Sequence, residues 1–427
     1  MRLNLSFGKG GAVRDVAVLA FGTIISQLII ILATPLLSRV YLPAEFGKLA
    51  VFLAVSAVAA TLITMRYETA ILVAKRDDEA ATLGVLALIL AVIGSILLGV
   101  GVGILPSAVL ELFGVGQLLF MLPVIFLMAC ASAFITVTQS WLNRKKCYVE
   151  MAKLRIFQSL GIVCFALVLG FMSLAYNGLL WAQALACIFT AIGSIWYARS
   201  AIVLWRPHLL WSAATAHINA PRYLLPTAVI DVVTMQMPVL LISIWFGEAY
   251  AGQFSMAWRM LMLPMAVVGA AVGQVFMQRL SQHQINSKQA RRLLMQTWML
   301  LLALGSVPLL IIFLFGEPVF SVFLGETWRD AGLMAATLSP LALAMFVSSP
   351  TSGSFVVLGI QKYSLWFGIS VLIYRPLCIF LGYIYKDITL GLILWVLCEL
   401  VQVFIYQLVA WKKMGDLNEG ILGEKKA

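Results

Sequence analysis

Long apolar stretches separated by short polar connections dominate the pattern of hydrophobic and polar positions along this chain. A helix needs about 20 predominantly apolar residues to cross the hydrocarbon core of a bilayer. Twelve stretches meet this requirement, so the pattern predicts an all-α polytopic membrane protein with twelve transmembrane helices. The predicted spans cover residues 15–38, 49–74, 81–104, 118–142, 152–173, 178–199, 223–246, 253–278, 293–315, 331–360, 364–385 and 389–411.

The composition agrees with this pattern. Hydrophobic residues make up 62% of the chain and charged residues only 11%, whereas soluble domains are typically about 45–50% apolar and about 25% charged. A soluble enzyme, a nucleic-acid-binding domain and a disordered chain are therefore excluded. The net charge of +11 is interpreted as a signal of membrane orientation, and no nucleic acid is expected as a partner.

The basic residues gather on one side of the predicted bundle. Of the 29 lysines and arginines, 22 lie in segments on the side of the N-terminus, four lie on the opposite side and three lie within spans. Cytoplasmic loops of membrane proteins carry the excess of basic residues. With twelve spans, this asymmetry predicts that both termini are cytoplasmic.

The polar connections between the predicted spans are all short, the longest being residues 316–330 outside and 200–222 inside. A polysaccharide polymerase or ligase usually carries a sizeable external loop with catalytic residues, and no Walker motif is present. The chain is therefore expected to be a transporter, a channel or a scaffold and not an enzyme. We predict four segments: a six-helix lobe (1–199), a cytoplasmic linker (200–222), a second six-helix lobe (223–411) and a cytoplasmic tail (412–427).

The two predicted lobes show signs of an internal repeat. Leu36–Ala50 and Leu240–Ser255 both run from an apolar helix end, through a short loop, to an aromatic residue, a glycine and another apolar helix. Because each half contains six spans, both halves enter the membrane from the same side. The repeat would be parallel, with its axis along the membrane normal.

Six ionisable residues lie inside predicted spans, where each costs about 2.5–3.5 kcal/mol and is a functional candidate by default. They are Arg66, Glu68, Asp231, Arg259, Arg375 and Glu399. Each also has a structural interpretation: an arginine can extend to the interface, Arg375 can pair with Glu399 in the next span, and a carboxyl can stay neutral or bind a local amide. Arg66 and Glu68 are two positions apart on one helix, so they are not expected to face each other.

Three arginines among few carboxylates indicate a cationic, water-filled cavity that suits an anionic substrate. Arginine fits phosphate well, since its planar guanidinium forms paired hydrogen bonds and stays charged. Prolines close to the charged residues predict broken helices there; they are Pro226, Pro238, Pro264 and Pro376. The hydroxyls of Ser348, Ser349, Thr351 and Ser352 could line a wall for sugar or serve close helix packing. No metal-ligand spacing is present, so neither a metal nor another cofactor is expected.

Two segments resemble the oligosaccharide flippases. The first contains Arg39-Val40-Tyr41-Leu42-Pro43-Ala44-Glu45-Phe46-Gly47 and, later, Arg66-Tyr67-Glu68-Thr69-Ala70-Ile71. The second contains Gly252-Gln253-Phe254-Ser255-Met256-Ala257-Trp258-Arg259, Leu263-Pro264 and Gly273-Gln274-Val275-Phe276, with Gln253 where the family more often has an aromatic residue. On these residues the chain resembles the O-antigen (Wzx-type) flippases of the multidrug/oligosaccharidyl-lipid/polysaccharide (MOP) exporter superfamily.

The resemblance implies two six-helix lobes around a central cavity in a bacterial inner membrane. It also implies movement of an undecaprenyl-pyrophosphate-linked oligosaccharide to the periplasmic leaflet by alternating access. Combined with the charge pattern, it predicts that Arg66, Arg259 and Arg375 bind the pyrophosphate, while Asp231, Glu68 or Glu399 binds a coupling Na⁺ or H⁺.

The partners that the resemblance implies are the lipid-linked oligosaccharide, membrane lipid, and possible contacts with a polysaccharide polymerase and glycosyltransferases. Two alternatives remain open: a drug or cation antiporter of the same superfamily, and a membrane polysaccharide polymerase or ligase. The antiporter would favour acidic residues over arginines in its cavity, and the short outer loops argue against the enzyme.

Overall fold

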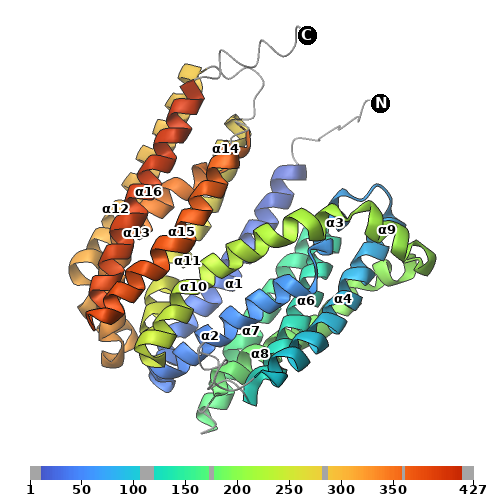
Figure 1. The fold of residues 1–427 in the computed structure, drawn as a ribbon, viewed down its shortest axis with the longest axis horizontal. Helices are drawn as coiled ribbons and strands as arrows, with labels where there is room; N and C mark the ends of the chain where they lie inside the picture. The colour runs from blue at the N-terminus through green and yellow to red at the C-terminus, as the bar shows by residue number, and fades with distance from the viewer. Residues whose placement is uncertain (1–10, 106–119, 173–176, 281–286, 358–360, 416–427) are drawn as a thin grey trace. The chain divides into compact units, whose positions relative to one another are not determined.

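The structure is a computed structural model that describes residues 11–105, 120–172, 177–280, 287–357 and 361–415. Every regular element in these ranges is a helix (Figure 1), which confirms the predicted all-α class. Eleven helices of the described part are long and apolar enough to cross a membrane. The remaining predicted span, residues 253–278, lies in α11 (Glu248–Leu280), a helix of 33 residues that stands outside those eleven.

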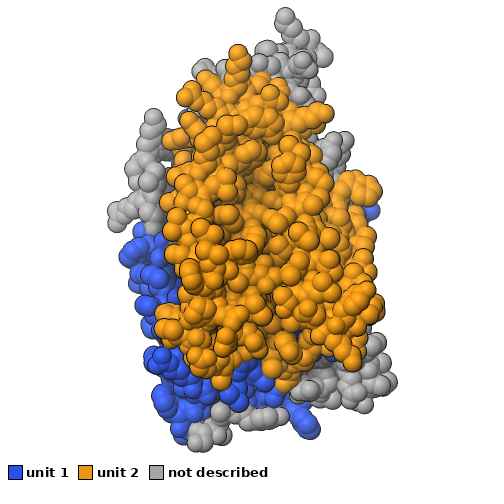
Figure 2. All heavy atoms as spheres, turned by 90° about the vertical axis from the view of Figure 1, so that its left-hand side faces the viewer, with its two compact units in different colours: residues 1–244 blue, residues 245–427 orange. Residues whose placement is uncertain are grey.

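Contacts divide the chain into two compact units, residues 1–244 and 245–427, which Figure 2 shows in different colours. In unit 1, α6 packs against five neighbours, α2, α3, α4, α7 and α8. The elements of this unit are α1 (Gly11–Val40), α2 (Pro43–Ile63), α3 (Tyr67–Val73), α4 (Asp77–Ile104), α6 (Leu122–Arg144), α7 (Tyr148–Phe171), α8 (Gly178–Leu204), η2 (Pro207–Leu209), α9 (Leu210–Ala216), η3 (Ala220–Leu224) and α10 (Leu225–Phe246), whose last turn crosses the boundary.

In unit 2, α13 takes the corresponding place and packs against α11, α12 and α16. The further elements are α12 (Ser287–Leu324), η4 (Glu326–Trp328), α13 (Arg329–Ser348), η5 (Ser349–Thr351), α14 (Ser354–Val357), α15 (Gln361–Ile384) and α16 (Ile388–Gly415). α6 covers most of the fourth predicted span of the first half, residues 118–142, and α13 covers the beginning of the fourth predicted span of the second half, residues 331–360. α6 and α13 thus each pack against several helices of their own unit, and the parallel repeat stays a prediction.

The segment that we predicted as a linker, residues 200–222, is largely helical and belongs to unit 1. The division between the units falls later, inside α10. The lobe boundaries at 199 and 223 thus remain predictions. Most of the predicted tail, residues 416–427, lies outside the described residues.

The start of α2 shows how one of the sequence motifs builds the fold. Pro43 occupies the first helical turn, where its missing N–H costs nothing, and the Glu45 carboxylate accepts a hydrogen bond from the Leu42 N–H at 3.0 Å. The buried Tyr41 hydroxyl donates to the carbonyl oxygen of Ala166 at 2.7 Å. These residues therefore cap α2 and attach the α1–α2 turn to α7.

Two predictions about helix continuity were wrong. α10, α11 and α15 continue through Pro238, Pro264 and Pro376, so these prolines do not end their helices, while Pro226 lies at the start of α10. The predicted outer loop, residues 316–330, is helical as far as Leu324, because α12 bends at Phe315 (φ −129°) and then continues. A Cβ atom on Gly316 would lie 2.4 Å from the carbonyl oxygen of Gly332, so only glycine permits this close approach of α12 to α13.

Candidate functional site

The second predicted span is interrupted at its most polar point. α2 ends at Ile63 and α3 begins at Tyr67. Between them, Met65 (φ 48°) and Arg66 (φ 63°) both adopt the left-handed conformation, which costs a non-glycine residue about 1–2 kcal/mol. The prediction of one continuous helix over 49–74 was therefore wrong. Strained backbone of this kind is concentrated at functional sites, so this turn is a candidate on geometric grounds.

This turn brings together two side chains that a regular helix would separate. The Arg66 guanidinium lies 3.3 Å from the Glu68 carboxylate, contrary to our expectation that they would not face each other. The left-handed Met65 and Arg66 interrupt the helix, so the spacing rules of a regular helix do not hold across this turn. Glu68 is 2% exposed, and its Oε2 has no hydrogen-bond partner in the described part of the chain. The pair is thus only partly satisfied, and the Arg66 side chain remains one-third exposed.

α3 has only seven residues and is held by the end of α6. The Arg144 guanidinium donates from Nη1 to the carbonyl oxygens of Ile71 (2.9 Å) and Ala74 (2.8 Å), and from Nε to Asp77 Oδ1 (3.0 Å). Lys145 also contacts the Asp77 carboxylate. One arginine therefore satisfies carbonyls that the end of α3 leaves open and ties them to the start of α4.

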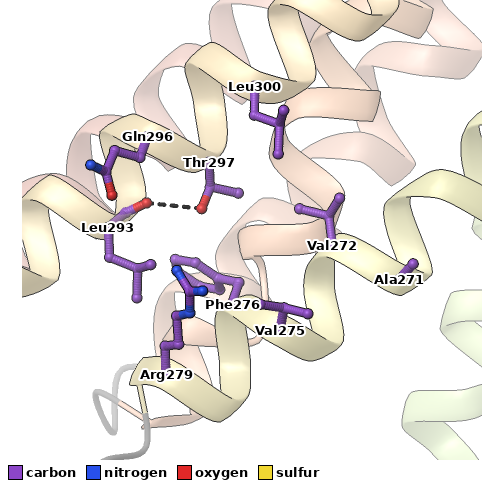
Figure 3. A pocket seen from close by; sticks show the side chains of 9 residues that line it. All are labelled: Ala271, Val272, Val275, Phe276, Arg279, Leu293, Gln296, Thr297 and Leu300. Atoms are coloured by element: carbon purple, nitrogen blue, oxygen red, sulfur yellow. Dashed lines mark hydrogen bonds between the residues drawn. The ribbon is translucent and has the colours of Figure 1, made fainter.

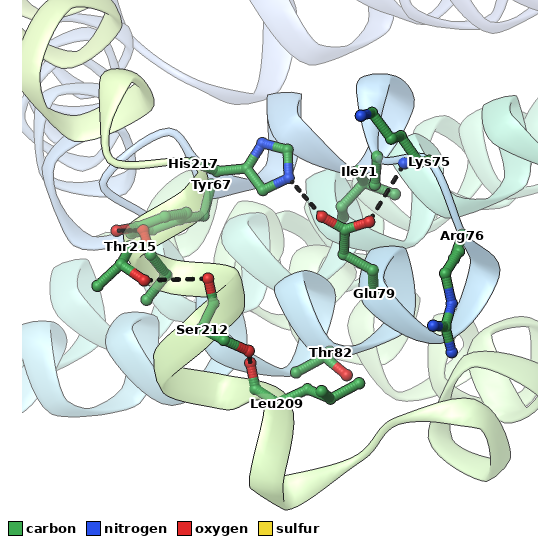
Figure 4. Close-up of polar contacts among 12 residues, drawn as sticks. Tyr67, Ile71, Lys75, Arg76, Glu79, Thr82, Leu209, Ser212, Thr215 and His217 are labelled. Atoms are coloured by element: carbon green, nitrogen blue, oxygen red, sulfur yellow. Dashed lines mark hydrogen bonds and ion pairs between the residues drawn. The ribbon is translucent and has the colours of Figure 1, made fainter.

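The segment after α8 packs onto the same region (Figure 4). The Tyr67 hydroxyl donates to the Ala214 carbonyl oxygen at 3.2 Å, and a ring nitrogen of His217 lies 2.9 Å from Glu79 Oε1. The Arg206 N–H donates to the Thr82 hydroxyl at 3.1 Å. The predicted linker thus holds α3 and α4 in place and does more than join two lobes.

We expect Arg144→Ala to lower the free energy of unfolding by about 2–3 kcal/mol, because two buried carbonyls lose a charged donor. Thermal unfolding of the purified protein measures this change. Lys145→Ala is the matched control: it removes an exposed contact to Asp77 and a cation–π contact with the Trp141 ring, and it should cost about 0–1 kcal/mol. Equal losses for the two variants would show that the contacts to the α3 carbonyls contribute little.

The second group of candidates lies in unit 2 around a buried ion pair. Arg375 on α15 donates from Nε to Glu399 Oε2 (2.9 Å) and from Nη2 to Glu399 Oε1 (2.6 Å). The two residues are only 6% and 5% exposed. The Trp395 indole N–H also donates to Glu399 Oε2 at 2.7 Å. The pairing that we considered as the structural interpretation of Arg375 is therefore present.

A cluster of aromatic rings lies beside this ion pair. The Arg375 guanidinium carbon lies 5.5 Å from the centre of the Trp395 ring, within cation–π distance. The Trp258 ring stacks on Trp395 with centroids 5.7 Å apart, and Phe254 lies 5.9 Å from Trp395. Sequence reasoning missed these aromatic residues, although the four-residue spacing of Trp395 and Glu399 placed them on one helical face.

Arg259 has a different environment from the other two arginines. It follows Trp258 on α11 and is half-buried. Within the described part of the chain, its guanidinium makes no ion pair and no hydrogen bond, whereas Arg66 and Arg375 each contact a carboxylate. Arg259 is thus a half-buried cation whose donors are available to an anion.

The other predicted candidates are placed as follows. Asp231 lies exposed on α10 and makes no ion pair with a described residue. The hydroxyls of Ser348, Thr351 and Ser352 donate to carbonyl oxygens three residues earlier in the chain. Ser349 is exposed. Within the described residues, no three His, Cys, Asp or Glu side chains gather into a possible metal site.

The polar stretch in η5 also makes a close helix contact, which was the second interpretation of its small residues. A Cβ on Gly273 of α11 would lie 3.3 Å from Pro350, and one on Gly353 would lie 2.5 Å from the Met277 sulfur. The role of these hydroxyls toward sugar remains a prediction.

Comparison with known proteins identifies the family. The family model described as "Polysaccharide biosynthesis protein" matches residues 36–332, well over half of the chain. The chain belongs to this family. The matched region includes Arg66, Glu68, Asp231 and Arg259 and ends before the Arg375–Glu399 pair. A search of curated protein sequences found no match.

Solved structures of membrane transporters share the two-lobed fold of this chain. The lipid II flippase MurJ in an inward closed conformation matches with a TM-score of 0.72 at 10% identity, covering 94% of this chain and 90% of MurJ. An inward-facing multidrug resistance MATE family transporter matches with a TM-score of 0.69 at 18% identity, covering 94% and 95%. A MOP superfamily transporter from Pyrococcus furiosus, described as having a binding pocket of reverse polarity, matches with a TM-score of 0.60 at 16% identity, covering 95% of this chain and 96% of that transporter.

Proposed function

We propose that this protein is a flippase for an undecaprenyl-pyrophosphate-linked oligosaccharide, an O-antigen or another surface polysaccharide unit. It moves this lipid from the cytoplasmic to the periplasmic leaflet of a bacterial inner membrane, with both termini cytoplasmic. Membership of a polysaccharide biosynthesis family supports the substrate class, and the fold shared with a lipid II flippase supports the activity. In this proposal the protein catalyses no covalent step; glycosyltransferases supply its substrate and a polymerase consumes its product.

The observation that carries the proposal is the half-buried cation of Arg259, which has no anionic partner among the described residues. A charge inside a membrane bundle is costly unless a counter-charge is supplied. A pyrophosphate supplies one and accepts the paired hydrogen bonds of a guanidinium. Arg259 is therefore proposed as the principal pyrophosphate-binding residue.

Arg66 and Arg375 are proposed to join Arg259 in a second step of substrate binding. Each contacts a carboxylate, Glu68 or Glu399, that must yield its place to the phosphate. A coupling proton on either carboxylate would neutralise it and release the arginine. Glu68 suits this role because one of its buried oxygens has no hydrogen-bond partner in the described chain. Na⁺ bound at Asp231 is the alternative coupling ion.

Exposed Asp231 favours the second candidate function, a drug or cation antiporter like the MATE family transporters of similar fold. Deletion of the gene separates the two functions. For the flippase, leaflet-specific labelling should find the lipid-linked saccharide accumulated on the cytoplasmic side, with drug sensitivity unchanged. Unchanged saccharide distribution together with increased sensitivity to cationic drugs would establish the antiporter instead.

A further inference from the structure

Unit 2 contains a surface groove between α11 and α12 with a volume of about 360 Å³ (Figure 3). One end of the groove is polar and the remainder is apolar. The lining residues are Ala271, Val272, Val275, Phe276 and Arg279 of α11, and Leu293, Gln296, Thr297 and Leu300 of α12. None of them belongs to the candidate site described above.

The polar end is formed by Arg279 and Gln296. In Figure 3 the Arg279 side chain extends from α11 toward α12. Arg279 makes no hydrogen bond or ion pair with another described residue, so its donors are free for a ligand. The Thr297 hydroxyl donates to the Leu293 carbonyl oxygen at 2.8 Å. Its hydrogen-bonding capacity is thus used within α12.

The apolar end of the groove continues along α12 as an exposed stripe. Leu300 at the groove is 49% exposed, and Leu304, Val307 and Ile311 follow at helical spacing with exposures of 52%, 63% and 49%. The Phe276 ring, 1% exposed, forms part of the groove floor. A chain of methylene groups lying in the groove would therefore continue onto an apolar helix face.

The charge around the groove selects for an anion. From residue 249 to residue 316 the sequence contains no aspartate or glutamate, but it contains Arg259, Arg279, Lys288, Arg291 and Arg292. Arg291 already donates to the Trp411 carbonyl oxygen and lies over the Trp411 ring. The charge count along the chain assigns this end of α11 and α12 to the cytoplasmic side. Basic pockets between helices on that side bind anionic lipid head groups.

We propose that this groove binds one anionic phospholipid of the adjacent leaflet. The Arg279 guanidinium binds the phosphate, the Gln296 amide lies beside the glycerol esters, and one acyl chain lies along Val272 and Leu300 toward the exposed stripe of α12. A single arginine and a groove of this volume match one monophosphate and one chain. The site does not depend on the proposed flippase function.

Native mass spectrometry of the purified full-length protein tests this site, with dioleoylphosphatidylglycerol as the probe and dioleoylphosphatidylcholine as the neutral comparison. Arg279→Ala should weaken phosphatidylglycerol binding about tenfold, because a hydrogen bond to a charged group is lost. Ala271→Phe, which fills the groove without changing its charge, should weaken binding by a similar factor. The Tm of the Arg279→Ala protein without added lipid should equal that of the unaltered protein, because Arg279 is exposed and has no described partner.

Two variants control for general effects. Arg292→Ala removes an exposed arginine of α12 that does not line the groove, and Val268→Phe places an aromatic residue on α11 outside it. Both variants should keep phosphatidylglycerol affinity within about twofold of the unaltered protein. An exposed arginine outside the groove contributes little to binding because solvent and salt screen its charge, and Val268→Phe does not fill the groove. This result, together with the loss for Arg279→Ala and Ala271→Phe, would establish the groove as the site.

Three results would overturn the proposal. An equal loss of phosphatidylglycerol affinity in Arg279→Ala and Arg292→Ala would mean that the lipid is attracted to the basic surface as a whole and not to the groove. Equal binding of phosphatidylcholine would mean that the cation selects nothing. Displacement of phosphatidylglycerol by an equal concentration of farnesyl pyrophosphate would assign the groove to the polyprenyl substrate.

Discussion

Arg375→Ala is expected to lower the free energy of unfolding by about 3–5 kcal/mol, because it leaves the Glu399 carboxylate buried without its counter-charge. Glu399 is 5% exposed and accepts two hydrogen bonds from Arg375, so solvent cannot replace the lost guanidinium. The protein should be strongly reduced in the membrane fraction. Quantitative immunoblotting of the membrane fraction and the Tm of the purified Arg375→Ala protein measure the loss.

The matched control is the exposed ion pair of the same unit. Arg329 lies 2.9 Å from Glu317, with side chains that are 66% and 38% exposed. Water and salt screen such a pair, and it contributes about 0–1 kcal/mol. Arg329→Ala should leave the amount of protein nearly unchanged. A comparable loss for both arginine variants would show that burial of the Arg375 pair has no special importance.

A double variant separates the structural role of Arg375 from a role in transport. Arg375→Met combined with Glu399→Gln removes both charges and keeps an acceptor for the Trp395 indole N–H. Replacing both members of a buried pair is far less costly than removing one, so the protein level should recover. If Arg375 binds pyrophosphate, glycan export should be absent in this double variant even though its protein level recovers. Export at the normal rate by this double variant would remove Arg375 from the proposed site.

The positions of the helices could be predicted because hydropathy reports directly on burial in lipid. Ten of the twelve apolar stretches agree closely with single helices of the structure, whereas the predicted spans 49–74 and 331–360 are each divided between several helical elements in the described residues. The Arg375–Glu399 contact was also among the expectations, since adjacent antiparallel helices bring residues of similar depth together. The helix positions depend on local hydropathy, and the Arg375–Glu399 contact depends on two helices that are consecutive in the sequence.

The turn at Arg66 could not be predicted from local pattern. Met65 and Arg66 adopt positive φ angles without a glycine or proline to mark the position. The conformation depends on distant groups: Arg144 on α6 satisfies carbonyls of α3, and the Ala214 carbonyl accepts the Tyr67 hydroxyl. The polar residue pattern identified the Arg66–Glu68 region as important, while its geometry is set by tertiary contacts that lie 70 or more residues away in the sequence.

Arg259→Gln should be produced at the normal level yet lose most glycan export. Arg259 contacts no carboxylate in the described structure, so its removal leaves no buried charge behind, in contrast to Arg375. Loss of a charge-assisted phosphate contact weakens binding by about 1.5–3 kcal/mol, which is about 10- to 150-fold. Export of the lipid-linked saccharide, normalised to the amount of protein in the membrane, measures the effect.

Arg259→Lys is the discriminating companion variant. Lysine keeps the positive charge but not the planar guanidinium that forms two parallel hydrogen bonds with phosphate. Export should therefore be partial with lysine and nearly absent with glutamine or alanine. An arginine that only extended its charge to the membrane interface would tolerate lysine fully and glutamine almost fully. Normal export by a well-produced Arg259→Gln protein would thus show that Arg259 does not bind the substrate, and it would leave the proposed pyrophosphate site without its principal cation.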